Sequence, residues 1–238
     1  MLLFKGLIAK RAIFLQQRGN TEAAIKDYEK LYQANYISSA YLVPYSILLL
    51  RRGKKEDFEK TKEVLKKAEK AFDITPERRR QLILHYAVAQ FRLGETDKAI
   101  HLLEASHQKN PGGMTYEALG FMYIETDDPD KALQYNMEAY EYDNEDPITL
   151  DNLGQVYYRM LGDKKTAKMY FDRAIALKDD QIDTLYFLSR YDMDEGNIPA
   201  AIEKLERALD GNFSPLNFIT RDDIAKEIEA LKARNQNA

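Results

Sequence analysis

The 34 residues GMTYEALGFMYIETDDPDKALQYNMEAYEYDNED (residues 113–146) decide the fold of this chain. Tyr116, Leu119 and Tyr123 are spaced i, i+3 and i+7, which places them on one apolar stripe of a helix. Gly120 and Ala132 have small side chains, and we expect them where two antiparallel helices cross most closely. The stretch therefore predicts a helical hairpin. Because one hairpin cannot cover its own apolar stripe, neighbouring hairpins must stack against it.

The same pattern recurs around this stretch, in residues 80–113, 147–181 and 182–215. Small residues at the crossing position are spaced 33, 35 and 34 residues apart, and they are Ala99, Ala132, Ala167 and Ala201. The longer spacing adds one residue, which we place in the turn near Leu161 and Gly162. Asp128 is expected to cap a helix that begins at Pro129. Four copies of a spaced pattern predict a helical repeat array.

The flanking segments predict less regular hairpins and a closing helix. Residues 1–75 read as two degenerate hairpins, with helices at 3–17, 21–34, 39–52 and 55–72. Ser38 or Ser39 is expected to cap the third helix, and Pro44 to kink it or delay its start. The fourth helix is expected to turn five apolar residues inward, namely Phe58, Val64, Leu65, Ala68 and Phe72. Residues 216–238 predict a helix over 220–234, capped by Thr220 with Asp223, and a short tail.

Composition limits the classes of protein and compartment. The chain has no cysteine, so it forms no disulfide and no thiolate metal site. It has no uncharged apolar run long enough to span a membrane, and Lys5, Lys10 and Arg11 interrupt any signal peptide at its start. We therefore expect a cytoplasmic protein, or one at the cytoplasmic face of a membrane if an upstream anchor has been removed.

The net charge of −4 is unevenly distributed. Residues 1–112 hold 21 basic and 13 acidic residues, which gives +8, and residues 113–238 hold 14 and 26, which gives −12. Two solvated surfaces of opposite sign would explain the split. Alternatively, the basic end faces an anionic partner such as a lipid surface or an acidic protein.

The spacing of Tyr116, Leu119-Gly120, Tyr123, Ala132 and Ala139 resembles a tetratricopeptide (TPR) repeat, which is two antiparallel helices in 34 residues. The resemblance covers residues 80–215 closely and 5–72 loosely. It implies an all-α, right-handed superhelix of about six helical hairpins plus a C-terminal capping helix. In this arrangement residues 1–238 form a single array, with four regular repeats in 76–215. The pattern departs at Asn136 and Asp192, where other repeats have large apolar residues.

TPR proteins are non-enzymatic scaffolds that bind peptides in a groove lined by the first helix of each repeat. Carried onto this chain, the resemblance implies a protein or peptide partner and a groove lined by Gln81, His85, Val88, Glu117, Phe121, Asp151, Gln155, Tyr158, Tyr186 and Arg190. Chaperone-binding members clamp a terminal carboxylate with Lys, Asn and Arg. Here Leu84, Val88, Glu117 and Phe121 stand at those places, so such a clamp is not expected. Phe121, Tyr158 and Tyr186 serve equally well as packing between repeats.

Residues for catalysis or metal binding do not form recognisable sets. His101 and His107 are six apart on one helix, so they point to different sides and do not chelate as an i, i+4 pair would. His85 has no partner carboxylate in the sequence pattern. Residues 127–130 lack EF-hand spacing, and no Gly-rich phosphate loop is present. We therefore predict no enzyme activity, metal, cofactor, small-molecule ligand or nucleic-acid partner.

A second resemblance is to bacterial TPR proteins that have a membrane anchor ahead of the repeats. Two stretches carry it, NMEAYEYDNEDPITLDNLGQVYY (residues 136–158) and FSPLNFITRDDIAKEI (residues 213–228). It implies a missing upstream tether. Together with the basic first half and an apolar-basic helix near Leu7, it gives an alternative function as a membrane-proximal assembly platform.

Overall fold

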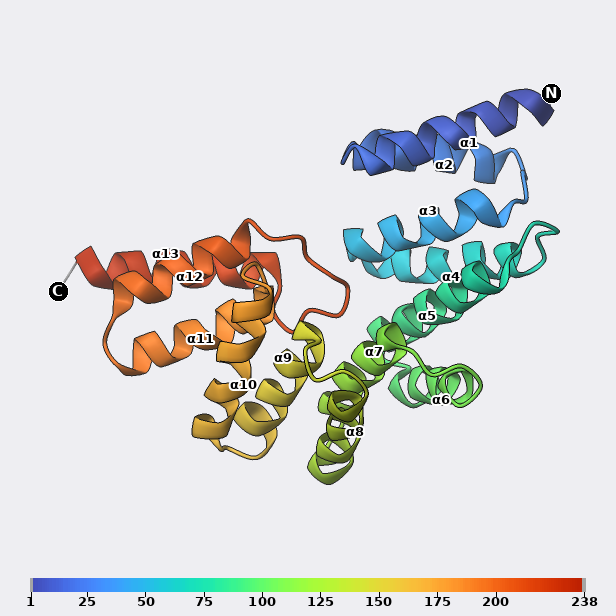
Figure 1. The fold of residues 1–238 in the computed structure, drawn as a ribbon. Coiled ribbons are helices and arrows are strands. Elements are labelled where there is room, and N and C mark those ends of the chain that lie inside the picture. Colours follow the sequence, from blue (N-terminus) through green and yellow to red (C-terminus); the bar gives the residue numbers. More distant parts are fainter. Residues whose placement is uncertain (1, 237–238) are drawn as a thin grey trace. The chain divides into compact units, whose positions relative to one another are not determined.

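The computed structural model describes residues 2–236, and all regular structure in that range is helical (Figure 1). Hairpins form between successive helices, which confirms six hairpins followed by a closing helix. The helices are α1 (Leu2–Gln17), α2 (Thr21–Gln33), α3 (Ser39–Arg52), α4 (Lys55–Glu69), α5 (Pro76–Arg92), α6 (Thr96–His107), α7 (Gly113–Ile124), α8 (Pro129–Tyr142), α9 (Pro147–Gln155), η1 (Val156–Met160), α10 (Lys164–Leu177), α11 (Ile182–Asp194), α12 (Ile198–Leu209) and α13 (Arg221–Gln236).

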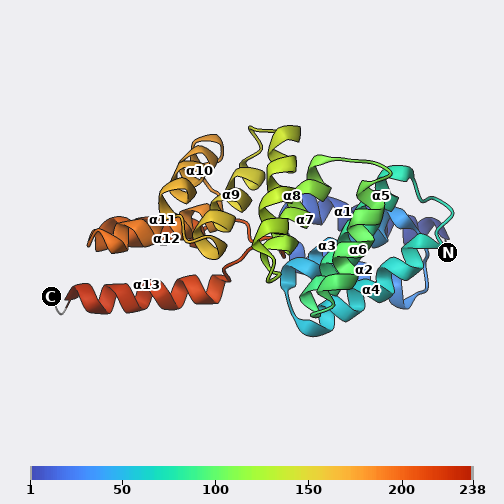
Figure 2. The ribbon, with the colours of Figure 1, turned by 90° about the horizontal axis from the view of Figure 1, so that it is seen from below.

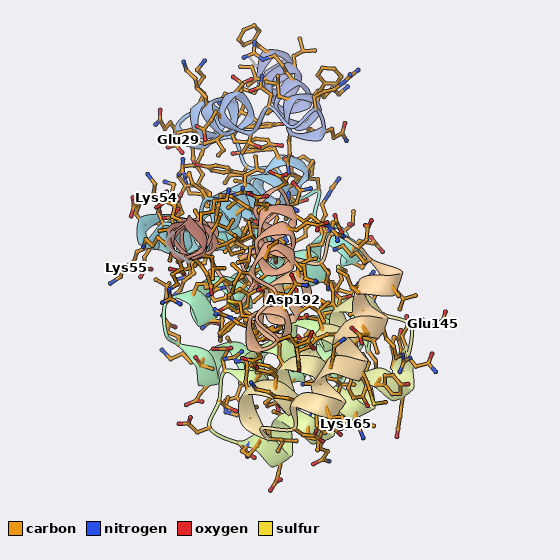
Figure 3. All side chains as sticks on the ribbon, turned by 90° about the vertical axis from the view of Figure 1, so that its left-hand side faces the viewer. Glu29, Lys54, Lys55, Glu145, Lys165 and Asp192 are labelled. Carbon is orange, nitrogen blue, oxygen red and sulfur yellow. The ribbon has the colours of Figure 1, made fainter. Side chains whose placement is uncertain are left out.

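Contacts between the helices group into two compact units, one ending at Asn110 and one beginning at Pro111. The division coincides with the charge split, because residues 111 and 112 are uncharged and the units therefore carry +8 and −12. Lys54 and Lys55 in the N-terminal unit and Glu145 in the C-terminal unit extend away from the ribbon into solvent (Figure 3). The prediction of one continuous array concerns how the units are joined, and it stays a prediction.

Tyrosines fill the centre of the N-terminal unit. The side chains of Tyr28, Tyr41 and Tyr45 are buried, and the ring centroid of Tyr28 lies 6.0 Å from that of Tyr41 and 5.5 Å from that of Tyr45. Their hydroxyls are satisfied: for example, Tyr28 donates to the side-chain oxygen of Gln16 at 2.8 Å. A buried phenol needs such a partner, and with one it packs like any large apolar side chain. Ala24 of α2 is fully buried in this hairpin, where α2 packs against α1.

The start of α3 differs from the prediction. The helix begins at Ser39 with Pro44 inside it, so Pro44 does not delay it. The side chain of Ser38 makes no cap hydrogen bond. Instead, the Asp73 carboxylate accepts from the backbone N–H groups of Ser39 at 2.8 Å and Ala40 at 3.3 Å. A residue that follows the next helix therefore supplies the acceptor for the first N–H groups of α3, which otherwise have no partner.

Replacing Asp73 with alanine is expected to lower the free energy of unfolding of the N-terminal unit by about 1–2 kcal/mol, the usual cost of losing a helix cap. Burial alone would raise the pKa of Asp73, but the hydrogen bonds from Ser38, Ser39 and Ala40 outweigh it and hold the pKa below its ordinary value. The carboxylate is therefore charged at neutral pH, where urea unfolding followed by circular dichroism measures the loss. Asp97→Ala, at an exposed position of α6, is the matched control. An equal loss in both variants would contradict the capping role.

Phe72 does not face inward, and that prediction is wrong. Its side chain is 93% exposed, because α4 ends at Glu69 and the helical stripe ends with it. Ile74, in the turn that follows, packs against the core instead. The other four residues predicted for this face, Phe58, Val64, Leu65 and Ala68, are buried as expected.

Small residues mark the helix crossings of the C-terminal unit, as predicted. Ala132, Ala167 and Ala201 are all fully buried. A Cβ atom added at Gly154 would lie 2.4 Å from the Phe171 ring, and one added at Gly120 would lie 2.3 Å from the side-chain oxygen of Asn136. Real Cβ atoms do not approach so closely, so the close packing of these helices requires glycine.

The two departures from the repeat pattern are accommodated by polar contacts. Asn136 is fully buried and donates to the backbone oxygens of Gly120 at 3.1 Å and Ala132 at 2.9 Å, which links α8 to α7. Asp192 accepts from Lys204 at 2.5 Å, between α11 and α12. Each departure therefore replaces an apolar contact within a hairpin by a hydrogen bond or ion pair.

The extra residue of the third regular repeat lies in a helix and not in the predicted turn. The turn after η1 has three residues, 161–163, the same number as the turns before α6 and α12. The distance from Gly154 to Ala167 is 13 residues, whereas that from Gly120 to Ala132 is 12. The π-helical turn Val156–Met160 accommodates the difference, because a π-helix bonds each residue one position further along than an α-helix.

The closing helix is confirmed. Thr220 caps it as predicted, because its Oγ1 accepts from the backbone N–H of Asp223 at 3.2 Å. The Asp223 carboxylate accepts from the Thr220 hydroxyl at 2.5 Å, whereas a full capping box would use the Thr220 backbone N–H. Ile224, Ile228 and Leu231 are buried against the last hairpin. Figure 2 shows α13 alongside α12.

Candidate functional site

In the N-terminal unit the predicted groove residues lie on α5. Gln81 is exposed, but Val88 is 3% exposed and belongs to the core. His85 Nδ1 lies 2.8 Å from the hydroxyl of Ser46 on α3. Burial, and to a lesser extent the charge of Arg51, lower the pKa of His85 to about 4. His85 is therefore neutral near pH 7 and links two helices.

In the C-terminal unit, α7 contributes Glu117 and Phe121. Phe121 is 4% exposed, whereas Glu117 is half-buried. Burial, with the charge of Asp146 as the second cause, raises the pKa of Glu117 to about 7. Its backbone oxygen accepts from the side chain of Asn152 on α9 at 3.1 Å. Glu117 can therefore accept or donate a hydrogen bond near neutral pH.

The next helix places Asp151 and Gln155 in a buried polar network. One carboxylate oxygen of Asp151 accepts from the Thr184 hydroxyl at 2.5 Å, and the other accepts from Gln155 Nε2 at 2.8 Å. Burial, and then the charge of Asp183, raise the pKa of Asp151 to about 7. The polar atoms of Asp151 are thus bonded within the unit, where they tie α9 to α11.

Tyr158, in the π-helical turn, packs among aromatic rings. Its ring centroid lies 5.2 Å from that of Phe187 and 5.7 Å from that of Tyr191, both on α11. It also lies 6.5 Å from Phe171 on α10. The Tyr158 ring therefore packs between two repeats.

Tyr186 and Arg190, the last two residues predicted for the groove, contact the C-terminal helix α13 and the connection that precedes it. The Arg190 guanidinium lies 4.5 Å from the Tyr186 ring centroid and forms an ion pair with Glu227 of α13 at 2.5 Å. Tyr186 is 9% exposed. The connection between α12 and α13, residues 210–220, contributes to this cover, and we call it the C-terminal strap.

Asp183 lies one turn before Tyr186 on α11, and its carboxylate binds backbone N–H groups of the C-terminal strap. The Asp183 carboxylate accepts from the backbone N–H groups of Phe218 at 2.9 Å and Ile219 at 3.3 Å, and from the side chain of Asn217 at 3.1 Å. Asp183 is 5% exposed. A buried carboxylate that accepts several hydrogen bonds positions a chain segment strongly, because removing those donors leaves the charge buried without partners.

The Phe218 side chain enters an aromatic and cationic setting. Its ring centroid lies 5.3 Å from Phe187 and 6.0 Å from Tyr186, and the Arg159 guanidinium lies over it at 4.0 Å. Arg159 is itself held by the Glu125 carboxylate at 2.6 Å and by the side-chain oxygen of Gln155 at 2.9 Å. We call the surface of η1 and α11 that bears Arg159, Asp183 and Tyr186 the inner face. The strap runs past these helices (Figure 1).

Asp183, Arg159 and Phe218 were missed from the sequence. One signal was present, because the strap has 11 residues, whereas the connections between α8 and α9 and between α10 and α11 have four each. A connection of unusual length in a repeat array is a common place for function. A second signal was that Asp183 precedes Tyr186 by three residues and so shares its stripe.

Among residues 2–236, no group of three or more His, Asp or Glu side chains is placed to hold a metal ion. Within the same described range, no helix is long and apolar enough to cross a bilayer.

Residues 149–177 match a family model described as a tetratricopeptide repeat. Among curated proteins, none matches the chain significantly in sequence. A solved thermophilic TPR protein from Thermus thermophilus is 15% identical with a TM-score of 0.54, over 96% of this chain and 99% of that one. PilF of Pseudomonas aeruginosa is 15% identical with a TM-score of 0.59, over 85% and 89%. YrrB, described as a TPR protein with an unusual peptide-binding site, is 18% identical with a TM-score of 0.50, over 75% and 88%. At these identities the likeness concerns the fold.

Proposed function

We propose that the chain is a non-enzymatic scaffold that binds an extended segment of a partner protein on its inner face, and the match of residues 149–177 to a tetratricopeptide repeat supports this. The observation that carries the proposal is the C-terminal strap. This segment of the chain lies on the inner face and is bound as a peptide ligand would be, through backbone N–H groups and one aromatic side chain. The peptide-binding site described for YrrB supports the use of this fold for such a ligand.

The strap indicates the chemistry of the partner segment. The Asp183 carboxylate accepts hydrogen bonds from two successive backbone N–H groups. An aromatic side chain packs against the rings of Tyr186 and Phe187 and against the guanidinium of Arg159. A partner segment with an aromatic residue in an extended stretch would make the same contacts by replacing the strap. Of the residues predicted for the groove, Tyr186 would contact the aromatic side chain, and Gln155 would hold Arg159 in place.

A labelled peptide with the sequence of residues 211–221, GNFSPLNFITR, tests the proposal by fluorescence anisotropy. Phe218→Ala in the full chain weakens the strap and is expected to let the peptide bind. The wild type should bind it at least about ten-fold more weakly, because a tethered segment competes at an effective concentration on the order of millimolar. Asn212→Ala, an exposed position of the same strap, is the matched control and should behave as the wild type.

Two further measurements test whether the peptide binds at the inner face. A peptide with alanine in place of its phenylalanine at position 218 should bind poorly to the Phe218→Ala chain. The doubly substituted chain with Asp183→Asn and Phe218→Ala should lose the wild-type peptide, because the amide has one acceptor oxygen where the carboxylate has two. Equal binding to the single and double variants, or no binding to Phe218→Ala, would show that the inner face does not take this kind of segment.

A further inference from the structure

The outward face of α1 carries large apolar side chains that nothing in residues 2–236 covers. Phe4, Leu7 and Phe14 are 69%, 63% and 54% exposed. Their spacing of three and seven residues puts them on one stripe. The inward side of the helix is made by other residues, since Ala9 and Ala12 are buried in the hairpin core. The exposed stripe is therefore not required to build the first hairpin.

Basic residues lie within and beside this stripe. Lys10, Arg11 and Arg18 are exposed on the same side of α1, and residues 2–17 contain no Asp or Glu. The Arg18 guanidinium lies 5.3 Å from the Phe14 ring centroid, and Arg11 forms an ion pair with Asp27 of α2 at 2.6 Å. Lys10 and Arg18 thus leave two cations beside the apolar stripe, on a unit whose net charge is +8.

We propose that this outward face of α1 lies on the surface of an anionic lipid bilayer. Bulky apolar side chains between cations are what an interfacial helix presents, because the apolar groups enter the boundary of the acyl chains while the cations stay among anionic headgroups. Since no described helix is long enough to span a bilayer, α1 would lie in the plane of the membrane.

The charges of the two units favour the same arrangement. The N-terminal unit at +8 is attracted to anionic headgroups, and the C-terminal unit at −12 is repelled by them. The membrane would therefore contact the chain through α1 of the N-terminal unit. The lipid-binding proposal does not depend on the proposed peptide-binding function, because different residues carry the two.

Tryptophan fluorescence gives a direct test, since the chain contains no tryptophan. Phe14→Trp places a single reporter in the α1 stripe, and Phe72→Trp places one at a residue that is 93% exposed elsewhere in the same unit. With vesicles of phosphatidylcholine containing about 30% phosphatidylglycerol, a typical anionic surface, the Phe14→Trp emission should shift to shorter wavelength. The Phe72→Trp emission should not shift, and neither should change with phosphatidylcholine alone.

Co-sedimentation with the same vesicles measures the affinity without a reporter. Leu7→Gln combined with Phe14→Gln should bind at least about ten-fold more weakly than the wild type, because both apolar anchors are lost. Lys10→Gln and Arg18→Gln should each cost roughly five-fold at low salt. Phe72→Gln should bind as the wild type. These positions are exposed, and unchanged circular dichroism confirms that each variant folds.

Three results would overturn the proposal. One is the absence of a Phe14→Trp shift on anionic vesicles. Another is an equal shift in both reporters, which would report general adsorption. The third is a concentration-dependent Phe14→Trp shift without vesicles, which would assign the stripe to a second copy of the chain. The peptide-binding test uses no lipid, so failure of one proposal is distinguishable from failure of the other.

Discussion

Replacing Phe171 with alanine is expected to lower the free energy of unfolding of the C-terminal unit by about 3–5 kcal/mol. Phe171 is fully buried, and its ring stacks on that of Phe187 with centroids 5.2 Å apart. The ring also lies directly against Gly154, where even a Cβ atom would be 2.4 Å away. The backbones of α9 and α10 are already as close as glycine permits, so we do not expect them to close the cavity left by the ring.

Urea unfolding followed by circular dichroism measures the loss, and hydrogen exchange in α9 to α12 assigns it to the C-terminal unit. Phe72→Ala is the matched control, because it removes the same ring from a 93% exposed position and should change stability by less than about 0.5 kcal/mol. Phe171→Leu keeps most of the volume and should cost clearly less than the alanine variant. A loss below about 1 kcal/mol in Phe171→Ala would mean that the hairpin adjusts and that Phe171 does not fix the crossing.

The stability of the C-terminal unit is expected to fall as the pH rises from about 4 to about 7, and Asp151→Asn should remove much of that fall. Burial and the charge of Asp183 raise the pKa of Asp151 to about 7 in the folded chain, whereas an unfolded aspartate titrates near 3.9. Between these values the folded state binds the extra proton. The stabilisation is therefore complete below the unfolded pKa and is lost as the pH rises through the folded pKa.

The amide is uncharged at every pH, so it avoids the cost of burying the carboxylate, although its single acceptor oxygen gives up the hydrogen bond from either Thr184 or Gln155. At pH 8 we expect Asp151→Asn to be more stable than the wild type by about 2 kcal/mol, and near pH 4 the two should be similar. Part of the fall in stability remains in the variant, because the pKa of Glu117 is also raised to about 7. Urea unfolding at roughly pH 4, 6 and 8, which covers the range between the two pKa values, measures the profile, with exposed Asp179→Asn as the control. A variant less stable than the wild type at pH 8 would mean that the charged form is the one the site favours.

The features predicted correctly from the sequence are local or periodic. The hairpins, the buried alanines and the cap at Thr220 each depend on residues within a few turns of each other. The features missed depend on contacts between distant positions. Asp73 caps α3 from 34 residues away, and Asp183 binds the strap from 34 to 36 residues away. Repeat spacing places two helices side by side, but it does not say which polar side chain of one will meet the backbone of the other.

The groove residues show the same limit. The spacing identified the stripe of each first helix, and Asp151 and Tyr186 do lie on α9 and α11. What bonds to each residue depends on the next repeat: Thr184 satisfies Asp151, and the strap covers Tyr186. The prediction for Phe72 was wrong for a related reason, because it extended the apolar stripe of α4 past Glu69, where the helix ends. Whether the predicted residues bind a partner stays a prediction that the peptide experiment addresses.

The π-helical turn at Val156–Met160 sets one repeat apart from its neighbours. The wider turn takes up one residue inside the helix, so Gly154 still meets Phe171 at the helix crossing as Gly120 meets Asn136 one repeat earlier. Arg159 lies in this turn, where it meets both Glu125 and Phe218. A solenoid of identical repeats would present the same chemistry at every step. Because this turn occurs in one repeat of the described chain, it places Arg159 where the other described repeats have an α-helical residue, and the surface at this repeat is therefore not periodic.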